Sequence, residues 1–268
     1  MNDQAVTPVV IKLSGKALCE TARLEALMRV LHEGGAPFVL VHGGGVAVDA
    51  LMKRLGLEVR RVRGLRVSPA EDMPVIAGAL AGTCGLELRG AAVRAGLMPL
   101  GLAVTDGGLA ELLPEDPELG RVAKTRAGRE EAKARLLGLL AAGWLPVISS
   151  VGIDAEGRLW NVNADDAAVA VAGLLGSPLV FLSDVRGVFD AEKSLIPTLT
   201  EAEAARLEQA GVITAGMAVK VHAAFEAGRV TGAPVAIASI LDESAPAAIL
   251  AGGCPGTTCA PGESVEVS

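Results

Sequence analysis

Residues 37–45 read PFVLVHGGG, a short apolar run that ends abruptly in three consecutive glycines. The next segment, 46–55 (VAVDALMKRL), has the character of a helix. A strand, a glycine turn and a helix in this order present free backbone N–H groups at a helix N-terminus, which attracts anions. Without Cβ atoms, the backbone can approach a phosphate or carboxylate closely. A plain tight turn is the alternative, but three successive glycines favour an anion site.

The segments around this turn predict an α/β fold. Residues 7–13 (TPVVIKL) read as a buried strand, and 22–33 have helical periodicity, so the chain opens as strand, helix, strand, helix. This order predicts a parallel sheet with right-handed crossovers. A soft division near residues 175–180 is expected to separate two halves that share one sheet. Further strands are predicted at 97–104, 145–149, 179–182 and 235–238. A strand or hairpin is predicted at 57–68, hairpins or loops at 105–128 and a hairpin at 152–160. Helices are predicted at 69–95, 130–142, 163–175, 200–209 and 216–230.

Composition narrows the possible partners. The chain has 268 residues, of which 51% are hydrophobic and only 2% aromatic, with no tyrosine. Stacking platforms for bases are therefore scarce, and a net charge of −7 without a basic block argues against nucleic acid and anionic membranes. We see no signal peptide and no apolar run approaching the roughly 20 residues of a membrane span. A soluble, cytoplasmic protein is expected.

The four cysteines and three histidines do not suggest a metal site. Cys254 and Cys259 are five positions apart, with no C-x-x-C pair and no nearby histidine. We expect the cysteines to be small buried thiols, and His42, at a strand end, to be structural.

Two lysines occupy positions where their charge is awkward. Lys12 interrupts an apolar strand, and Lys220 lies three residues after Met217 and four before Ala224, on the apolar side of its helix. Burying an ammonium group is costly without a partner. Lys12 could point out of the sheet and Lys220 could snorkel to solvent, but we favour a ligand-facing role for both.

Two further polar segments carry weaker signals. Arg66 would suit a carboxylate through its bidentate fork, or it could be an exposed cation on a hairpin that also holds Arg60, Arg61 and Arg63. In residues 161–166 (NVNADD), Asn163 can cap a helix whose dipole suits Asp165 and Asp166. Capping does not explain Asn161, so function and structure are equally good interpretations there.

Two loops are candidates for nucleotide contacts. Residues 184–189 follow a strand, where open α/β sheets place ligand loops, and 212–216 precede a helix with Thr214 and a glycine. Neither is specific alone. The sequence contains no G-x-x-x-x-G-K-[ST] and no G-x-S-x-G motif, which excludes a P-loop and the corresponding hydrolase motif.

Taken together, seven short segments in register resemble the amino acid kinase family across nearly the whole chain. They are IKLSG (11–15), VHGGG (41–45), GLRVS (64–68), GALAG (78–82), NVNAD (161–165), LSDV (182–185) and GMAVK (216–220). Each motif is weak alone, but the ordered set is specific.

This resemblance implies a three-layer α/β/α sandwich around a mainly parallel sheet. It implies an N-terminal lobe, 1–177, for acetylglutamate binding and dimerisation, and a C-terminal lobe, 178–268, for ATP. The implied reaction is ATP-dependent phosphorylation of the side-chain carboxylate of N-acetyl-L-glutamate to N-acetyl-L-glutamyl 5-phosphate, the second step of arginine biosynthesis. Mg²⁺ would be carried by the nucleotide phosphates, with no protein metal site.

The resemblance also implies the roles of individual residues. Lys12 and Lys220 would neutralise the transferring phosphoryl group, and Asp165 would hold both lysines in place. Gly44 and Gly45 would cradle the reacting end of the substrate, while Arg66 and Asn161 bind its amino-acid end. Nucleotide contacts would come from Gly15, Asp184, Val185, Arg186, Gly187, Val188, Phe189, Val212, Ile213 and Thr214.

The chain departs from the family pattern in places. Ser14 replaces a frequent glycine, so this turn either offers a hydroxyl or lies further from the phosphates; Ser68 for threonine is mild. The chain begins about eight residues before its first strand, without the extra N-terminal helix of arginine-inhibited relatives. We therefore expect an arginine-insensitive homodimer.

Two rival functions stay open at this point. One is a family kinase acting on another acid or on carbamate, for which Arg66 and Asn161 are the discriminating residues. The other is a catalytically silent sensor of nucleotides or amino acids. Retention of Lys12, Asp165 and Lys220 together argues against a silent protein.

Overall fold

The computed structural model describes residues 7–253 and 255–260. Its first half contains β1 (Val9–Leu13), η1 (Ala17–Cys19), α1 (Thr21–Glu33), β2 (Phe38–His42), α2 (Gly45–Arg54), β3 (Arg61–Val62), β4 (Leu65–Arg66), α3 (Met73–Ala77), η2 (Gly78–Cys84), α4 (Gly85–Arg94), β5 (Met98–Ala103), η3 (Asp106–Gly108), β6 (Ala110–Pro114), η4 (Pro117–Leu119), β7 (Val122–Ala127), α5 (Glu130–Ala141), β8 (Trp144–Ser149), β9 (Val151–Ile153), β10 (Leu159–Val162) and α6 (Ala164–Leu175). The second half contains β11 (Leu179–Ser183), β12 (Thr198–Leu199), α7 (Glu201–Gln209), α8 (Ala215–Thr231), β13 (Val235–Ser239), α9 (Ala245–Leu250) and β14 (Thr257–Cys259).

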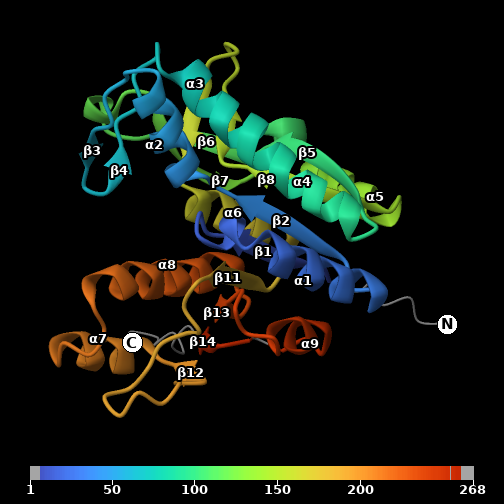
Figure 1. Cartoon of the computed structure of the whole chain (residues 1–268), viewed down its shortest axis with the longest axis vertical. Coiled ribbons are helices and arrows are strands. Elements are labelled where there is room, and N and C mark those ends of the chain that lie inside the picture. Colours follow the sequence, from blue (N-terminus) through green and yellow to red (C-terminus); the bar gives the residue numbers. More distant parts are fainter. Residues whose placement is uncertain (1–6, 254, 261–268) are drawn as a thin grey trace, which may run out of the picture.

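An eight-stranded sheet in the order β12-β14-β13-β11-β1-β2-β8-β5 organises the molecule. All its neighbouring strands run parallel except β13 and β14. β1 pairs with β2 on one side and with β11 on the other, so the two halves of the chain share one sheet. In Figure 1 the second half, in orange and red, lies below β1 and β2. The predicted α/β fold is confirmed.

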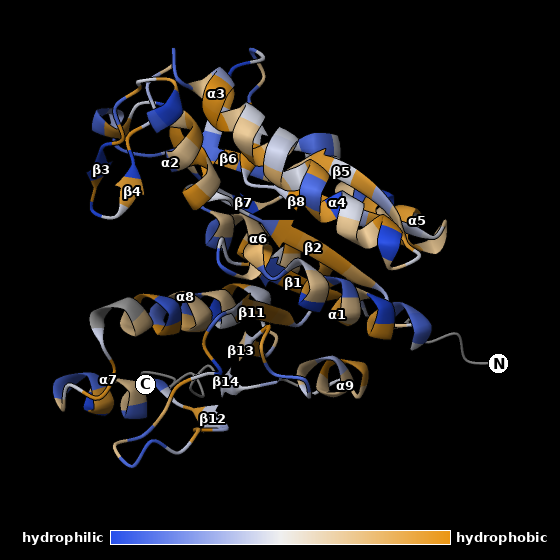
Figure 2. Ribbon diagram, in the orientation of Figure 1, coloured by the Kyte–Doolittle hydropathy of each residue, from blue (hydrophilic) through white to orange (hydrophobic). Residues whose placement is uncertain are grey.

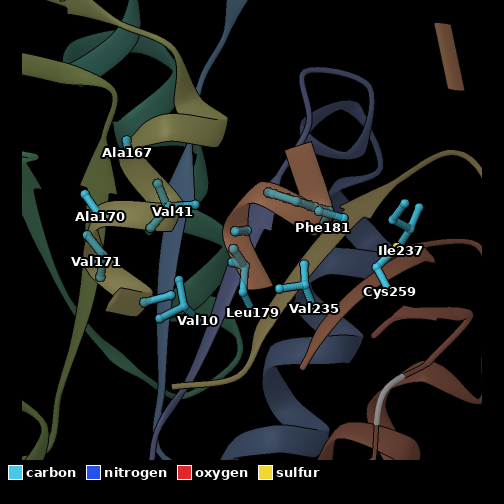
Figure 3. Packing of buried hydrophobic residues seen from close by; sticks show 14 of the residues in the cluster. Val10, Val41, Ala167, Ala170, Val171, Leu179, Phe181, Val235, Ile237 and Cys259 are labelled. Atoms are coloured by element: carbon cyan, nitrogen blue, oxygen red, sulfur yellow. The ribbon is translucent and has the colours of Figure 1, made fainter. Parts of the chain in front are cut away.

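The two faces of β1 belong to two separate apolar cores. Ile11 and Leu13 pack with residues of α1, α4 and α9. Val10 packs on the opposite face, with residues of α5, α6 and α8 (Figure 3). Strands β2 and β11 are buried along their whole length and hydrophobic in colour (Figure 2). Because side chains alternate along a strand, Lys12 lies on the α6 face.

Smaller elements cover the carboxyl edge of this sheet above the first half. Strands β6, β7, β10 and β9 form a four-stranded sheet, and β3 and β4 form a two-stranded hairpin. The hairpin is much shorter than the predicted strands at 57–68, and its turn has positive φ at Arg63 and Gly64. Together with α2, these elements wall the space above β1 and β2.

The long helix expected at 69–95 is interrupted. It begins at Met73, changes to a π-helix over Gly78–Cys84 and continues as α4. Glycines weaken the standard helical ladder, and π-segments occur mostly at functional sites. Here the π-segment brings Leu80 and Cys84 against the glycine turn at Gly44.

The predicted helix cap at Asn163 is confirmed, and Thr200 caps a second helix in the same way. Asn163 Oδ1 accepts a hydrogen bond from Asp165 N at the start of α6, and Thr200 Oγ1 accepts one from Glu203 N at the start of α7. The expectation of buried cysteines is wrong for Cys19, which is exposed, while Cys84 and Cys259 are buried. Cys254 lies outside the described residues. Within 7–253 and 255–260, no helix is long and apolar enough to cross a bilayer.

Candidate active site

A cavity of about 270 Å³ opens at the carboxyl ends of β1 and β2. Backbone of the glycine turn forms one wall, and α2, the β3–β4 hairpin and β10 form the others. Ligands of open α/β sheets bind at this edge. Six predicted site residues line it together: Lys12, Gly15, Gly44, Gly45, Arg66 and Asn161.

Lys12 faces this cavity and not bulk solvent. Its Nζ lies 2.5 Å from Asp165 Oδ1, and its side chain is only 15% exposed. The ammonium also lies 5.9 Å from the centre of the Phe181 ring. Asp165 is held in the first turn of α6, whose N-terminus favours a carboxylate. The alternative in which Lys12 points out of the sheet is therefore wrong.

Arg66 is buried, which excludes the alternative of an exposed hairpin cation. Its side chain is 7% exposed and forms an ion pair with Asp49 of α2. Its Nη2 donates a hydrogen bond to Gly45 O at 3.1 Å. Burial opposes ionisation of Asp49, but hydrogen bonds from Arg61 and Arg66 outweigh it and hold the pKa of Asp49 below its usual range. Asp49 thus fixes the guanidinium at the cavity wall.

Asn161 belongs to the same hydrogen-bonded network as Arg66. Its Nδ2 donates to Ser68 Oγ at 3.1 Å, and that hydroxyl donates to Arg66 O at 3.1 Å. Ser68 is fully buried. A satisfied buried network of this kind is rigid, so Arg66 and Asn161 keep a fixed relative position beside the cavity.

Gly44 is required by close packing. A Cβ on this residue would lie 2.5 Å from Cys84 Sγ and 3.2 Å from Leu80 Cδ2. The π-segment therefore presses directly on the turn, and α2 begins at the next residue, Gly45. Backbone of Gly43, Gly44 and Gly45 lines the cavity. Close packing therefore explains the glycine at position 44, and the role of the turn as an anion site stays a prediction.

Lys220 lies on α8, across β11 from the cavity. Its Nζ donates to Ser183 Oγ at 3.2 Å. Burial lowers the pKa of Lys220, the charge of Asp184 opposes this shift, and the charges of Lys12 and Lys16 add to it. The resemblance implied that Asp165 holds both lysines. In the structure Asp165 pairs with Lys12, whereas it acts on Lys220 only through its charge.

The predicted nucleotide loop 184–189 combines exposed and buried residues. Asp184 and Arg186 expose 33% and 67% of their side chains. Val188 is buried, and its N–H donates to Thr257 Oγ1 at 2.8 Å. Gly187 has φ 144°, and a Cβ there would lie 2.5 Å from Thr257 Oγ1. Val185 packs against the apolar core, while Phe189 is 38% exposed.

The second predicted nucleotide segment, 212–214, lies just before α8. Thr214 is exposed at the N-cap position of α8, but its side chain makes no capping hydrogen bond. Ile213 is 6% exposed and packs in the core beside α8, and Val212 is half-buried. The side chains of Val188 and Ile213 thus serve packing, and their backbone N–H groups are used within the protein: Val188 N donates to Thr257 Oγ1 and Ile213 N to Leu207 O.

Three residues outside the predicted set join the site. Ser14 Oγ accepts a hydrogen bond from Ala17 N at 3.2 Å, so it organises the turn after β1. Lys16 Nζ lies 2.6 Å from Asp184 Oδ2 and thereby joins that turn to the end of β11. Asp49 binds Arg66. A cation directly after Gly15 was a usable signal for Lys16, whereas nothing in the sequence pairs Asp49 with Arg66.

Asp166 follows Asp165 in the first turn of α6 but has a different environment. Burial raises the pKa of Asp166 to about 6, and the neighbouring charge of Asp165 adds to the shift.

His42 is buried, its Nδ1 lies 2.9 Å from Gly43 O, and burial lowers the pKa of its imidazole. Within the part of the chain that the structure describes, no group of three or more His, Cys, Asp and Glu side chains could hold a metal ion.

Comparison with known proteins identifies the class to which this fold and site belong. The profile described as "Amino acid kinase family" matches residues 7–239, so the chain belongs to that family. "Acetylglutamate kinase" of Aeromonas salmonicida is 47% identical over 254 residues, which cover 93% of this chain and 96% of the relative. "Acetylglutamate kinase" of Vibrio campbellii is 49% identical over 236 residues, covering 87% and 89%.

Among solved structures, the fold resembles N-acetylglutamate synthase from Neisseria gonorrhoeae complexed with coenzyme A and N-acetyl-glutamate. The TM-score is 0.78 at 22% identity, and the match covers 96% of this chain and 60% of that one. At this level of identity the likeness supports the amino acid kinase fold alone.

Proposed function

We propose that this protein transfers the γ-phosphoryl group of ATP to the side-chain carboxylate of N-acetyl-L-glutamate. The product is N-acetyl-L-glutamyl 5-phosphate, and the reaction is the second step of arginine biosynthesis. Identity of 45–49% to acetylglutamate kinases over most of the chain makes the protein an enzyme of this kind. ATP is the donor used in its family.

One observation supports the site assignment most strongly. The Lys12–Asp165 ion pair borders the same cavity that the glycine turn and the buried Arg66 line. A cation, free backbone N–H groups and a carboxylate-binding guanidinium are the groups that a reaction between two anions requires.

The chemistry requires charge compensation more than proton transfer. A carboxylate is ionised near neutral pH and needs no general base. One of its oxygens attacks the γ-phosphorus, the bond from that phosphorus to the β–γ bridging oxygen breaks, and ADP departs with the electron pair. We assign Lys12 and Lys220 to the charge that spreads over the phosphoryl oxygens. Mg²⁺, carried by the nucleotide phosphates, would offset the remaining charge.

The acceptor site is assigned to the first half of the chain, residues 1–177. Arg66, held by Asp49, would bind a carboxylate at the amino-acid end of the substrate, and Asn161 would bind beside it. Backbone of Gly44 and Gly45 would grip the junction between the reacting carboxylate and the γ-phosphate. The cavity of about 270 Å³ suits a small dicarboxylate of this size.

The nucleotide site is assigned to residues 178–268 together with Gly15. The exposed groups of Asp184, Arg186 and Thr214 and the backbone of the two loops would contact ATP. A homodimer, insensitivity to arginine and a cytoplasmic location are part of the proposal and rest on the family resemblance.

A coupled assay tests the proposal directly. Purified protein with Mg²⁺, ATP and N-acetyl-L-glutamate is expected to form a hydroxylamine-trapped acyl phosphate and equimolar ADP. N-acetyl-L-aspartate, free glutamate and carbamate serve as competing acceptors, and preference for any of them would refute the assigned substrate. The same assay with added arginine tests insensitivity, and light scattering tests the dimer.

A further inference from the structure

Lys16 follows the turn that ends β1 and lies at the seam between the two halves. Its Nζ is 2.6 Å from Asp184 Oδ2, a contact between residues 168 positions apart. The preceding residue, Gly15, lines the acceptor cavity, and Lys12 on β1 faces it. Lys16 therefore approaches the place where the acceptor and the nucleotide must meet.

The Lys16 charge is close enough to Lys220 to affect its pKa, which is lowered chiefly by burial. The charges of Lys12 and Lys16 both contribute to the lowered pKa of Lys220, and the charge of Asp184 opposes them. The hydrogen bond from Lys16 is the largest cause of the lowered pKa of Asp184. Three lysines and Asp184 thus form one electrostatic group around the phosphoryl-transfer position.

The Lys16–Asp184 pair is the exchangeable part of this group. The Lys16 side chain is 73% exposed, whereas that of Lys12 is 15% exposed and held by Asp165. An exposed ion pair contributes little to stability, so its cation can leave at small cost. Asp184 would still have the Lys220 charge beside it. The terminal phosphates of ATP carry more negative charge than one carboxylate, so they attract the Lys16 ammonium more strongly than Asp184 does.

We propose that Lys16 is a nucleotide-binding residue that exchanges its ion pair with Asp184 for the terminal phosphates of ATP. This inference deepens the proposed function and rests on it for the identity of the nucleotide. Lys16 lies just after β1, the strand that holds Lys12. Contact of Lys16 with the phosphates therefore orients this turn beside the acceptor. Lys16 sets nucleotide affinity, while Lys12 and Lys220 act on the transferring group.

The experiment compares Lys16→Met, which removes the charge at similar length, with Lys16→Arg and with Lys53→Met. Lys53 is an exposed lysine near the C-terminal end of α2 and is the matched control. Calorimetry with the full chain measures binding of Mg²⁺–AMP-PNP and of AMP. Steady-state assays measure kcat and the KM values for ATP and N-acetyl-L-glutamate.

We expect Lys16→Met to weaken AMP-PNP binding and raise KM for ATP by about 5- to 20-fold. AMP affinity and KM for N-acetyl-L-glutamate are expected to stay within about twofold, because neither depends on a contact with the terminal phosphates. Lys16→Arg is expected to restore most of the affinity, and Lys53→Met to match the wild type. Dependence on phosphate number separates a phosphate contact from a purely structural role.

Unchanged AMP-PNP affinity in Lys16→Met would overturn the inference, and so would an equal loss for AMP. If the wild type phosphorylates N-acetyl-L-glutamate while Lys16→Met binds AMP-PNP normally, the inference fails and the proposed function stands. If the wild type does not phosphorylate that acceptor but Lys16→Met loses AMP-PNP affinity, the proposed function fails and the phosphate contact stands.

Discussion

The proposed acceptor side and the proposed nucleotide side of this site are built differently. On the acceptor side, Arg66 is 7% exposed, ion-paired with Asp49 and joined to Asn161 through the buried Ser68. On the nucleotide side, the charged groups are solvated: Arg186 is 67% exposed and Asp184 is 33% exposed. One side is a fixed polar network, and the other is a set of accessible charges on loops.

Two aspartates outside the cavity lining also differ in environment. Burial raises the pKa of Asp166, at the start of α6, to about 6. The pKa of Asp184 is lowered instead, chiefly by the hydrogen bond from Lys16. Buried polar groups discriminate strongly, because a ligand that fails to pair with them leaves them unsatisfied. We expect specificity to be concentrated on the proposed acceptor side, because Arg66 and Asn161 belong to a buried network there.

Removing a lysine that serves both sides is expected to have the largest effect. Lys12→Ala and Lys220→Ala should each lower kcat by at least about 10³-fold, because charge on the transferring phosphoryl group loses a preorganised cation. The measurement is the rate at which the acyl phosphate is formed. Circular dichroism and thermal melting control for folding. Turnover within tenfold of the wild type in both variants would refute these roles.

The next effect is confined to the acceptor side. Arg66→Lys keeps the charge but loses the planar fork, so KM for N-acetyl-L-glutamate should rise about 10- to 100-fold. KM for ATP should change less than about threefold, since Asp49, Met52 and Gly45, with which the Arg66 side chain pairs, lie on α2. Steady-state kinetics with each substrate varied separately decide this. Equal changes in both KM values would break the division between the sides.

A pH-dependent stability change is expected at Asp166. Its folded pKa of about 6 lies above the ordinary value of 3.8, so the folded state binds a proton more tightly than the unfolded chain. The free energy of unfolding therefore falls as pH rises through this interval. Asp166→Asn removes that penalty and should be more stable than the wild type by about 1–2 kcal/mol at pH 8. Urea unfolding at pH 8 and pH 5 tests this; an advantage that is larger at pH 5 would contradict it.

The smallest effect is expected on the nucleotide side. Arg186 is largely exposed, and its closest carboxylate oxygen, Asp242 Oδ2, is 3.9 Å away. Arg186→Ala should raise KM for ATP by no more than about threefold, because solvated charges contribute little. KM for ATP at two salt concentrations provides the measurement. A tenfold rise would show that this face is as selective as the acceptor cavity.

The sequence predicted the large elements and most acceptor-side residues. Lys12 and Lys220 stood out because a charge in an apolar pattern needs a partner. The partner itself was harder to predict: Asp49 lies 17 positions from Arg66, and periodicity cannot join a helix to a hairpin across that distance. Lys16 was overlooked because an exposed lysine in a turn is ordinary until its contact with Asp184 is seen.

Short elements escaped prediction for a different reason. β12 and β14 contain two and three residues, and α9 contains six. None of these elements repeats its hydrophobic period often enough to be recognised in the sequence. The π-segment at Gly78–Cys84 has the composition of an ordinary helix, so composition alone does not reveal its wider turns or the packing of Leu80 and Cys84 against Gly44. The division into lobes and the roles of the loop residues remain predictions.

The position of β1 has a consequence for how the chain folds. This strand lies near the N-terminus, yet its backbone completes both β2 and β11. Either half alone would present a long apolar strand with unpaired backbone groups, and such an edge invites association with other chains. The halves are therefore expected to melt in one cooperative transition. During synthesis, β1 can pair with β2 first, and it can pair with β11 only after the second half of the chain has been made.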